Sequence, residues 1–387
     1  MTPKEQGYYM PAEWARHEAT WLTYPKNPDS WPGKIETIYP SYHLFVKILA
    51  ESEMVHINVD DDAMLNHVKK ELEAVGTNMQ NIGLHIIPSN DAWCRDHGPA
   101  FLLNHHFGTS PKLGEVDARR ADGGVCPRAI VNWNHNAWGG KYPYELDTQV
   151  PLRIFDYLNS PSQLEGVDAR SADGGVADGG VWKLFEPNIV MEGGSIDVNG
   201  CGDLLTTTSC LLNPNRNPNL NQDQIEGYLR DYYGVDNIIW LGDGIVGDDT
   251  DGHVDDLSRF VSPDTIVTVV ENDAWDENYE PLQKNLRMLN RCRLANGKQP
   301  TIVELPMPDV VFYDNQRLPA SYANFYIANG KVIFPTYRCL ADNEAAYILE
   351  ALFPDREIIG IDSTDIVWGL GSFHCLSQQM PALTVNF

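Results

Sequence analysis

The sequence predicts an α/β fold on three observations. Strand-like and helix-like segments alternate along the 387 residues. Hydrophobic residues make up 43% of the chain, which is ordinary for a folded protein with a sizeable core. No charged or Pro/Gly/Ser-rich linker divides the sequence. We therefore expect one domain over residues 1–387.

The first unit runs from a strand at 51–59 (ESEMVHINV) through a helix at 62–75 to a strand at 84–88 (LHIIP). The same rhythm returns in the second half of the chain. Helices are predicted there at 222–233, 280–296 and 342–352, and strands at 237–241, 265–270, 301–305, 331–335 and 357–361. Several similar α/β units therefore follow one another.

Two near-identical segments interrupt this pattern. Residues 116–125 have the sequence VDARRADGGV, residues 167–176 have VDARSADGGV, and ADGGV follows at 177–181. The repeat is too short to be a repeat of the fold. We predict surface insertions near 109–127 and 162–182 and assign no chemistry to them.

The charge balance limits the partners. With 28 Lys+Arg against 54 Asp+Glu, the net charge of −26 would repel nucleic acid and anionic lipid. The expected binding partners are cationic small molecules or basic peptides. Most of these charges are explained equally well if they only keep the surface soluble. No apolar run approaches the ~20 residues of a membrane span, so we expect no membrane association.

Cysteine usage indicates the compartment. The seven cysteines are odd in number and form no C-x-x-C pair, which disfavours both a disulfide framework and a thiolate zinc site. A reducing cytoplasm fits best.

The most acidic stretch, LGDGIVGDDTDGHVDDL at 241–257, is open to several interpretations. Its G-x-G-x-x-G opening is followed by aspartates that a pyrophosphate would not tolerate. A calcium loop with glycine at position 6 would have Gly247 first and Ser258 last, so it fails at both ends. A catalytic zinc site usually needs two or three clustered His or Cys ligands, and this stretch contains only His253, so the support for zinc is weak. On an extended segment, His253 and Asp255 would face the same pocket; the alternative is an Asp-rich surface turn.

Three further segments carry candidate groups. Trp93, Arg95 and Asp96 follow the predicted strand at 84–88, where α/β folds commonly place functional groups, although Arg95 and Asp96 could form only a structural ion pair. Glu192 precedes two glycines that would permit a close backbone or ligand approach, or simply a hairpin bend. Cys375 follows small residues and is either a nucleophile or a buried inert thiol.

Together these segments resemble the agmatine deiminase family, which belongs with peptidylarginine deiminases in the guanidine-modifying superfamily. The resemblance follows the order of the family over nearly the whole chain. The segments are 10–14 (MPAEW), 20–21 (TW), 24–25 (YP), 90–96 (NDAWCRD), 98–99 (GP), 136–142 (NAWGGKY), 192–194 (EGG), 210–218 (CLLNPNRNP), 251–255 (DGHVD), 374–375 (HC) and 378–379 (QQ).

The resemblance implies a fold and a site. The fold would be a pentein-type, five-fold pseudo-symmetric α/β propeller of ββαβ modules, forming one catalytic domain with its site in the central channel and using no metal and no organic cofactor. Cys375 matches the nucleophile, His253 the general acid/base, and Glu192 the acid beside that histidine. Asp96 and Asp255 match the carboxylates that hold the guanidinium, and Trp93 an aromatic near the substrate. Ser372 replaces an asparagine common in the family.

The implied activity is hydrolysis of agmatine to N-carbamoylputrescine and ammonia through a covalent thiouronium, as in putrescine biosynthesis. Two carboxylates would orient the guanidinium, and the Cys375 thiolate would attack its central carbon. The partner would be a small cationic guanidine; a homo-oligomer is compatible with the pattern. Alternatives are a protein-arginine deiminase that forms citrulline in peptides, a non-catalytic propeller that binds cations or peptides, and a metal-dependent amidinohydrolase.

Overall fold

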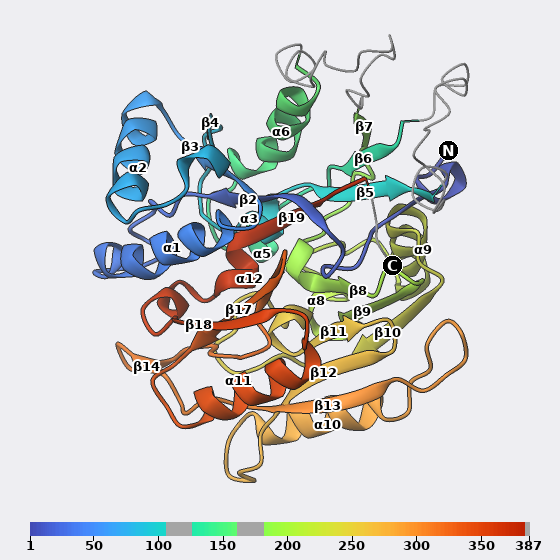
Figure 1. Cartoon of the computed structure of the whole chain (residues 1–387). Coiled ribbons are helices and arrows are strands. Elements are labelled where there is room, and N and C mark those ends of the chain that lie inside the picture. The colour runs from blue at the N-terminus through green and yellow to red at the C-terminus, as the bar shows by residue number, and fades with distance from the viewer. Residues whose placement is uncertain (106–125, 161–181, 384–387) are drawn as a thin grey trace.

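The computed structural model describes residues 1–105, 126–160 and 182–383 and has an α/β fold (Figure 1). Within these residues the strands form five sheets of three or four strands and one two-stranded hairpin. In sheet order, the strands are β1 (Tyr8–Tyr9), β5 (Ala100–Asn104), β6 (Arg128–Val131) and β7 (Trp182–Phe185); β10 (Asn237–Leu241), β9 (Asp203–Thr207) and β8 (Ile196–Val198); β11 (Ser258–Ser262), β12 (Thr265–Val270) and β13 (Thr301–Pro306); β16 (Tyr326–Ala328), β17 (Lys331–Thr336) and β18 (Glu357–Asp362); and β19 (Ser377–Pro381), β2 (His17–Thr23), β3 (Met54–Val59) and β4 (Ile82–Ile86). The hairpin joins β14 (Phe312–Tyr313) and β15 (Gln316–Arg317).

The five sheets share one pairing pattern. An antiparallel pair is followed by a parallel partner in each: β5–β6–β7, β8–β9–β10, β11–β12–β13, β16–β17–β18 and β19–β2–β3. In the last of these sheets, the C-terminal β19 pairs with the N-terminal β2, so the two ends of the chain close the same sheet.

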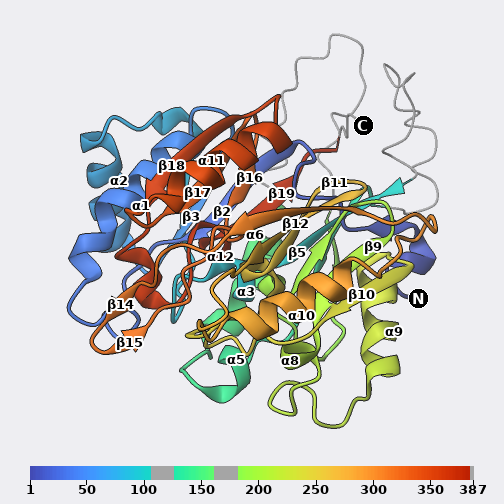
Figure 2. The ribbon, with the colours of Figure 1, turned by 90° about the horizontal axis from the view of Figure 1, so that it is seen from below.

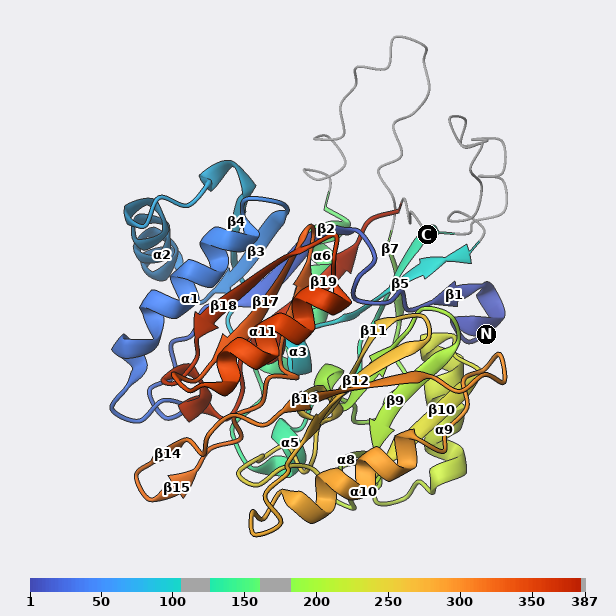
Figure 3. The same cartoon turned by 60° about the horizontal axis from the view of Figure 1, so that its bottom comes forward.

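In Figure 1 most long helices lie toward the edge of the view and the short ones nearer its middle, and Figure 2 shows the same ribbon from below. The long helices are α1 (Ile35–Leu49), α2 (Asp62–Ala74), α6 (Val150–Leu158), α9 (Gln222–Tyr233), α10 (Tyr279–Leu289) and α11 (Ala341–Leu352). The short ones are α3 (Cys94–His97), α5 (Ala137–Gly140), α8 (Thr208–Leu211) and α12 (Phe373–Leu376). Three of the long helices each pack against two neighbouring sheets and so connect them. Helix α10 contacts β12 and β10, α11 contacts β18 and β13, and α1 contacts β3 and β18. Figure 3 shows the same arrangement tilted, with α3 enclosed by the sheets.

Most predicted elements of the second half are confirmed with small shifts at their ends. The helix at 222–233 begins and ends as predicted, since Asn221 and Gln224 form a capping box and Gly234 ends the helix at φ 70°. The helix predicted at 280–296 is α10, which ends earlier, at Leu289, and the rest of the predicted range is a loop that turns at Gly297 with φ 80°. The strand predicted at 51–59 begins only at Met54, and the strand predicted at 84–88 is β4.

The predicted insertions near 109–127 and 162–182 lie almost wholly outside the described residues, which include only Cys126, Pro127 and Trp182 of them. Of the helices that are described, none combines the length and apolarity needed to cross a membrane.

Candidate active site

The sulfur of Cys375 lies at the centre of the site. Cys375 is on the short helix α12, immediately before β19, and its side chain is 4% exposed. Asp255 Oδ2 lies 3.6 Å from Sγ. Burial raises the pKa of the thiol well above its usual value, and the carboxylates of Asp255, Asp256 and Asp96 raise it further.

Three separate chain segments converge around Gly194. A Cβ atom at this glycine would lie 2.5 Å from His253 Nδ1, 2.9 Å from Asp96 Oδ1 and 3.0 Å from Asp255 Oδ2. A Cβ at Gly193 would lie 2.1 Å from the backbone oxygen of Arg95. The two glycines therefore permit the close backbone approach predicted from the sequence.

His253 is fully buried between carboxylates. Its Nδ1 lies 3.7 Å from Asp96 Oδ1, and its Nε2 lies 3.8 Å from Glu192 Oε2. Burial alone would lower the pKa of the imidazole, but the negative charge of Asp96 and contributions from Cys210 and Glu192 outweigh it and raise the pKa well above the ordinary value. The ring is therefore positioned to hold a proton.

Glu192 is kept ionised by an arginine. Arg216 Nε lies 2.7 Å from Glu192 Oε1, and both side chains are fully buried. Burial would raise the pKa of Glu192, yet Arg216 and His253 bring it to about 2. Arg216 also binds Asp251 Oδ2 at 2.6 Å and the carbonyl oxygen of Thr250 at 2.7 Å, so it connects Glu192 to the acidic loop before His253.

Asp96 and Asp255 are held by different donors. Trp138 Nε1 donates to Asp96 Oδ2 at 2.9 Å, and the backbone N–H of Gly194 donates to Oδ1 at 3.0 Å. Asp255 Oδ2 lies 2.6 Å from His374 Nδ1. Burial raises the pKa of Asp96, whereas for Asp255 the interaction with His374 overrides burial and lowers the pKa.

A buried charge network supports His374 from behind. Its Nε2 lies 2.7 Å from Glu13 Oε2, and Glu13 also pairs with Arg259 at 2.9 Å and with Arg95 at 3.3 Å. Arg95 thus pairs with Glu13, so the structural pair with Asp96 considered from the sequence is wrong.

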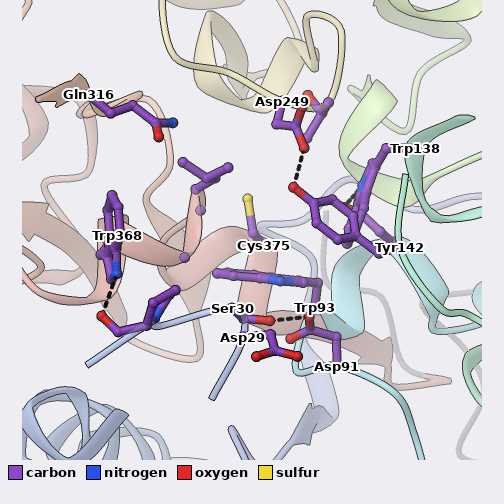
Figure 4. A pocket seen from close by; sticks show the side chains of 16 residues that line it. Asp29, Ser30, Asp91, Trp93, Trp138, Tyr142, Asp249, Gln316, Trp368 and Cys375 are labelled. Atoms are coloured by element: carbon purple, nitrogen blue, oxygen red, sulfur yellow. Dashed lines mark hydrogen bonds between the residues drawn. The ribbon is translucent and has the colours of Figure 1, made fainter. Parts of the chain in front are cut away.

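A cavity of about 190 Å³ opens above Cys375 (Figure 4). Figure 4 shows the sulfur pointing into it between Trp368 on one side and Trp138 and Tyr142 on the other, with Trp93 beneath. Asp96 also lines the cavity, whereas His253, Glu192 and Asp255 do not. His253 lies next to Asp96, and Asp255 lies next to the sulfur of Cys375.

Acidic groups line the remainder of this cavity. Asp29, Asp91 and Asp249 belong to the lining. Asp249 Oδ2 accepts a hydrogen bond of 2.6 Å from the Tyr142 hydroxyl, and Asp91 accepts one from Ser30. Burial raises the pKa of Asp91 to about 6. A cavity with four carboxylates in its lining, Asp29, Asp91, Asp96 and Asp249, favours a ligand that carries positive charge.

Among the residues that the structure describes, two groups of side chains have donor atoms close enough together to hold a metal: Glu192 with Cys210 and His253, and Asp255 with Asp256 and Cys375. Both coincide with the site already described. Glu192 in the first group is already paired with Arg216 at 2.7 Å, which reduces the charge it can offer to a cation.

All the predicted site residues lie in this region, although one predicted local geometry is wrong. The segment from His253 to Asp255 is not extended: a 3₁₀ turn spans Val254–Asp256, with His253 just before it. Asp251 at φ 67° and Gly252 at φ 103° turn the chain, so the two side chains approach Gly194 from a bend. Glu192 follows an isolated bridge between Asn134 and Val190 and not a hairpin bend.

Several site residues were given no role from the sequence. These are Glu13, Trp138, Arg216, Asp256, Arg259, Asn324 and His374. Glu13, Trp138, Arg216 and His374 stand within segments shared with the family, which was an available signal. Asn324 and Arg259 lie outside those segments.

Comparison with known proteins places this constellation in a family. A family model described as Porphyromonas-type peptidyl-arginine deiminase matches residues 9–381. The chain belongs to this family.

Individual relatives agree over their full length. A putative agmatine deiminase from Legionella pneumophila is 34% identical, with 98% of this chain and 96% of that protein covered. The structure of the Enterococcus faecalis agmatine deiminase superposes with a TM-score of 0.83 at 28% identity, covering 99% of this chain and 98% of that one. A C. jejuni agmatine deiminase solved with substrate bound gives 0.78 at 30% identity, covering 96% of both chains.

Proposed function

We propose that this protein hydrolyses agmatine to N-carbamoylputrescine and ammonia. The observation that carries the proposal is that Cys375 and Asp96 line one small cavity, with Asp255 Oδ2 3.6 Å from the sulfur and His253 Nδ1 3.7 Å from Asp96 Oδ1. The names of the relatives, which are agmatine deiminases, support the same substrate.

Asp96 and Asp255 would hold the guanidinium. A bidentate carboxylate pair fixes the plane of the cation and supplies strong charge-assisted hydrogen bonds. The positive charge of the substrate would offset the carboxylates around Sγ, so that the Cys375 thiol releases its proton to solvent as the substrate binds. Trp93, below the sulfur in Figure 4, would pack against the substrate.

Cys375 would then form a bond from Sγ to the central guanidinium carbon. His253 donates its proton to one amino group, the C–N bond breaks, and ammonia leaves a covalent thiouronium. The neutral imidazole next removes a proton from water, which attacks the same carbon. Collapse of that adduct expels the thiolate and releases the ureido product. Glu192 would orient the ring and favour its protonated form.

The remaining acids of the cavity lining, Asp29, Asp91 and Asp249, would attract the primary ammonium group at the other end of the substrate. Hydrogen bonds from Ser30 to Asp91 and from Tyr142 to Asp249 hold two of these carboxylates in position. We further propose a single catalytic domain with a five-fold arrangement of the sheets, supported by their shared pairing pattern. A cytoplasmic location is supported by the seven free cysteines.

The substrate test compares agmatine, free arginine and a blocked arginine peptide, with ureido product and ammonia measured for each. We expect turnover of agmatine. Activity on the peptide alone would instead assign the protein-arginine deiminase reaction that the family description names. Release of urea in place of ammonia would identify an amidinohydrolase.

The role of the nucleophile is tested with Cys375→Ala. Turnover should disappear while calorimetric binding of agmatine persists, because the carboxylates that hold the guanidinium remain. A variant that turns over at the wild-type rate would remove Cys375 from the reaction, and wild-type protein that binds agmatine without turnover would be a non-catalytic cation-binding module.

A further inference from the structure

An amide side chain with no assigned role contacts the reactive sulfur. Asn324 Nδ2 lies 3.0 Å from Cys375 Sγ, and the asparagine is 1% exposed. It sits two residues before β16, 51 residues from Cys375 in the sequence. It does not line the substrate cavity.

Backbone donors fix which end of the amide faces the sulfur. Asn324 Oδ1 accepts hydrogen bonds from the backbone N–H of His374 at 3.1 Å and of Cys375 at 3.3 Å. If the amide were flipped, its NH₂ group would face these two backbone N–H groups. Donors would then face donors, and neither backbone N–H would have an acceptor. The Nδ2 group must therefore face Sγ.

A second acceptor holds the same nitrogen. Asn324 Nδ2 lies 2.9 Å from Asp256 Oδ1, and Asp256 is 2% exposed. Burial raises the pKa of Asp256 well above its ordinary value, and the neighbouring Asp255 and Asp248 raise it further. One N–H of the amide therefore binds Asp256 Oδ1, and the other is directed at the sulfur.

The sulfur needs such a donor. The thiolate would form beside Asp255 Oδ2 at 3.6 Å, in a site where each nearby carboxylate opposes a second negative charge. An N–H donor stabilises the thiolate more than the neutral thiol, because hydrogen bonds to charged groups are the stronger kind.

We propose that Asn324 is the hydrogen-bond donor that stabilises the Cys375 thiolate, with its amide oriented by the backbone of α12 and by Asp256. This inference rests on Cys375 being the nucleophile of the proposed reaction. In this proposal, Asn324 stabilises the thiolate that forms the bond to the guanidinium carbon, in addition to the stabilisation that the positive charge of the substrate provides.

The test is the rate at which iodoacetamide, a neutral reagent, alkylates Cys375 in the free enzyme between about pH 6 and 9, followed by mass spectrometry of its peptide. Below the pKa of a thiol, this rate is proportional to the thiolate fraction. In Asn324→Ala and Asn324→Asp the rate at each pH should fall about tenfold or more, which is the size expected for losing a hydrogen bond to a charged group. Asn324→Asp keeps the side-chain volume and the acceptor for the two backbone N–H groups.

Steady-state kinetics give a second readout. For both variants, kcat with agmatine should fall about tenfold or more while KM stays within about threefold, because Asn324 is outside the substrate cavity. A change confined to KM would contradict the proposal.

Asn199 provides a matched control. It is 2% exposed, its Oδ1 accepts from the backbone of Cys201 and Asp203, and its Nδ2 donates to Asp203 Oδ2 at 2.8 Å and to the carbonyl of Pro263 at 2.9 Å. Asn199→Asp should lower the melting temperature to a similar extent yet leave the alkylation rate of Cys375 within about twofold.

Equal alkylation rates in wild-type protein and both Asn324 variants would overturn the proposal. Because alkylation is measured without substrate, its outcome is independent of the substrate assignment. Wild-type protein that fails to hydrolyse agmatine, while the Asn324 variants still slow alkylation, would reject the proposed function and leave the hydrogen bond to the thiolate in place.

Discussion

Asp91 is a carboxylate of the cavity lining whose pKa is set mainly by burial. It is 9% exposed, and burial raises its pKa to about 6, with a smaller contribution from the neighbouring Asp147, although hydrogen bonds from Ser30 and Ala92 oppose the shift. It therefore changes charge in a range of pH where the exposed carboxylates of the surface are already ionised.

This predicts how agmatine binding depends on pH. Below about pH 6 Asp91 is mostly neutral, and above it the carboxylate attracts the ammonium group of the substrate, so KM should fall several-fold between about pH 5 and 7. The measurement is KM against pH for wild-type protein and Asp91→Asn. The variant should have a higher KM at pH 7 and a flatter profile; an equally steep profile in the variant would assign the dependence to another group.

The segment Glu192–Gly193–Gly194 concentrates the constraints of the site in one short element. The 3₁₀ turn at Gly193–Ser195 brings its backbone against Arg95 and its second glycine against His253, Asp96 and Asp255. A side chain at either glycine would have to displace the buried side chains of His253, Asp96 and Asp255 or the backbone of Arg95.

Gly194→Ala should therefore lower kcat/KM for agmatine at least about hundredfold, since displacement of reacting groups by ~1 Å has that effect. Overpacking should also cost about 1–3 kcal/mol in the free energy of unfolding. Both are measured on the purified variant, by steady-state kinetics and by denaturant titration.

Gly227→Ala is the control for that substitution. Gly227 lies inside α9, and apart from the backbone of that helix no heavy atom lies within 4 Å of the position that a Cβ would take there. Replacing a helical glycine by alanine should raise the free energy of unfolding by about 0.5–1 kcal/mol and leave activity unchanged. Full activity in Gly194→Ala would mean that the close approach of the three segments is not needed.

The elements also show what sequence can and cannot predict. The helix at 222–233 was predicted to the residue because its start and stop signals, Asn221, Gln224 and Gly234, are local. The extended geometry expected for His253 and Asp255 was wrong because a 3₁₀ turn spans Val254–Asp256, which no local sequence signal revealed. The role of Asn324 could not be predicted from the sequence, because its partners Asp256 and Cys375 lie 68 and 51 residues away.

At the scale of the whole molecule, the α/β class followed from alternation of elements, whereas the order of the sheets required contacts between distant segments. Pairing of β19 with β2 is such a contact, and it places Cys375 beside the sheet that begins near Glu13. The candidate site residues were recognisable because they stand in shared segments, yet their charges depend on buried partners such as Arg216 and Arg259.

The net charge of −26 has a consequence for catalysis that depends on salt. An acidic molecule raises the local concentration of a doubly positive substrate, and added salt screens that attraction. Raising NaCl from about 0.02 M to 0.5 M shortens the Debye length from about 20 Å to about 4 Å. We expect KM for agmatine to rise several-fold over this range while kcat changes less than about twofold, because the buried carboxylates around Cys375 are poorly screened.

Steady-state kinetics at fixed pH measure both constants, and alkylation of Cys375 by neutral iodoacetamide is the control that should vary little with salt. A KM that does not respond to salt would restrict the electrostatic attraction to the carboxylates lining the cavity, with the remaining surface charge having no part in substrate capture.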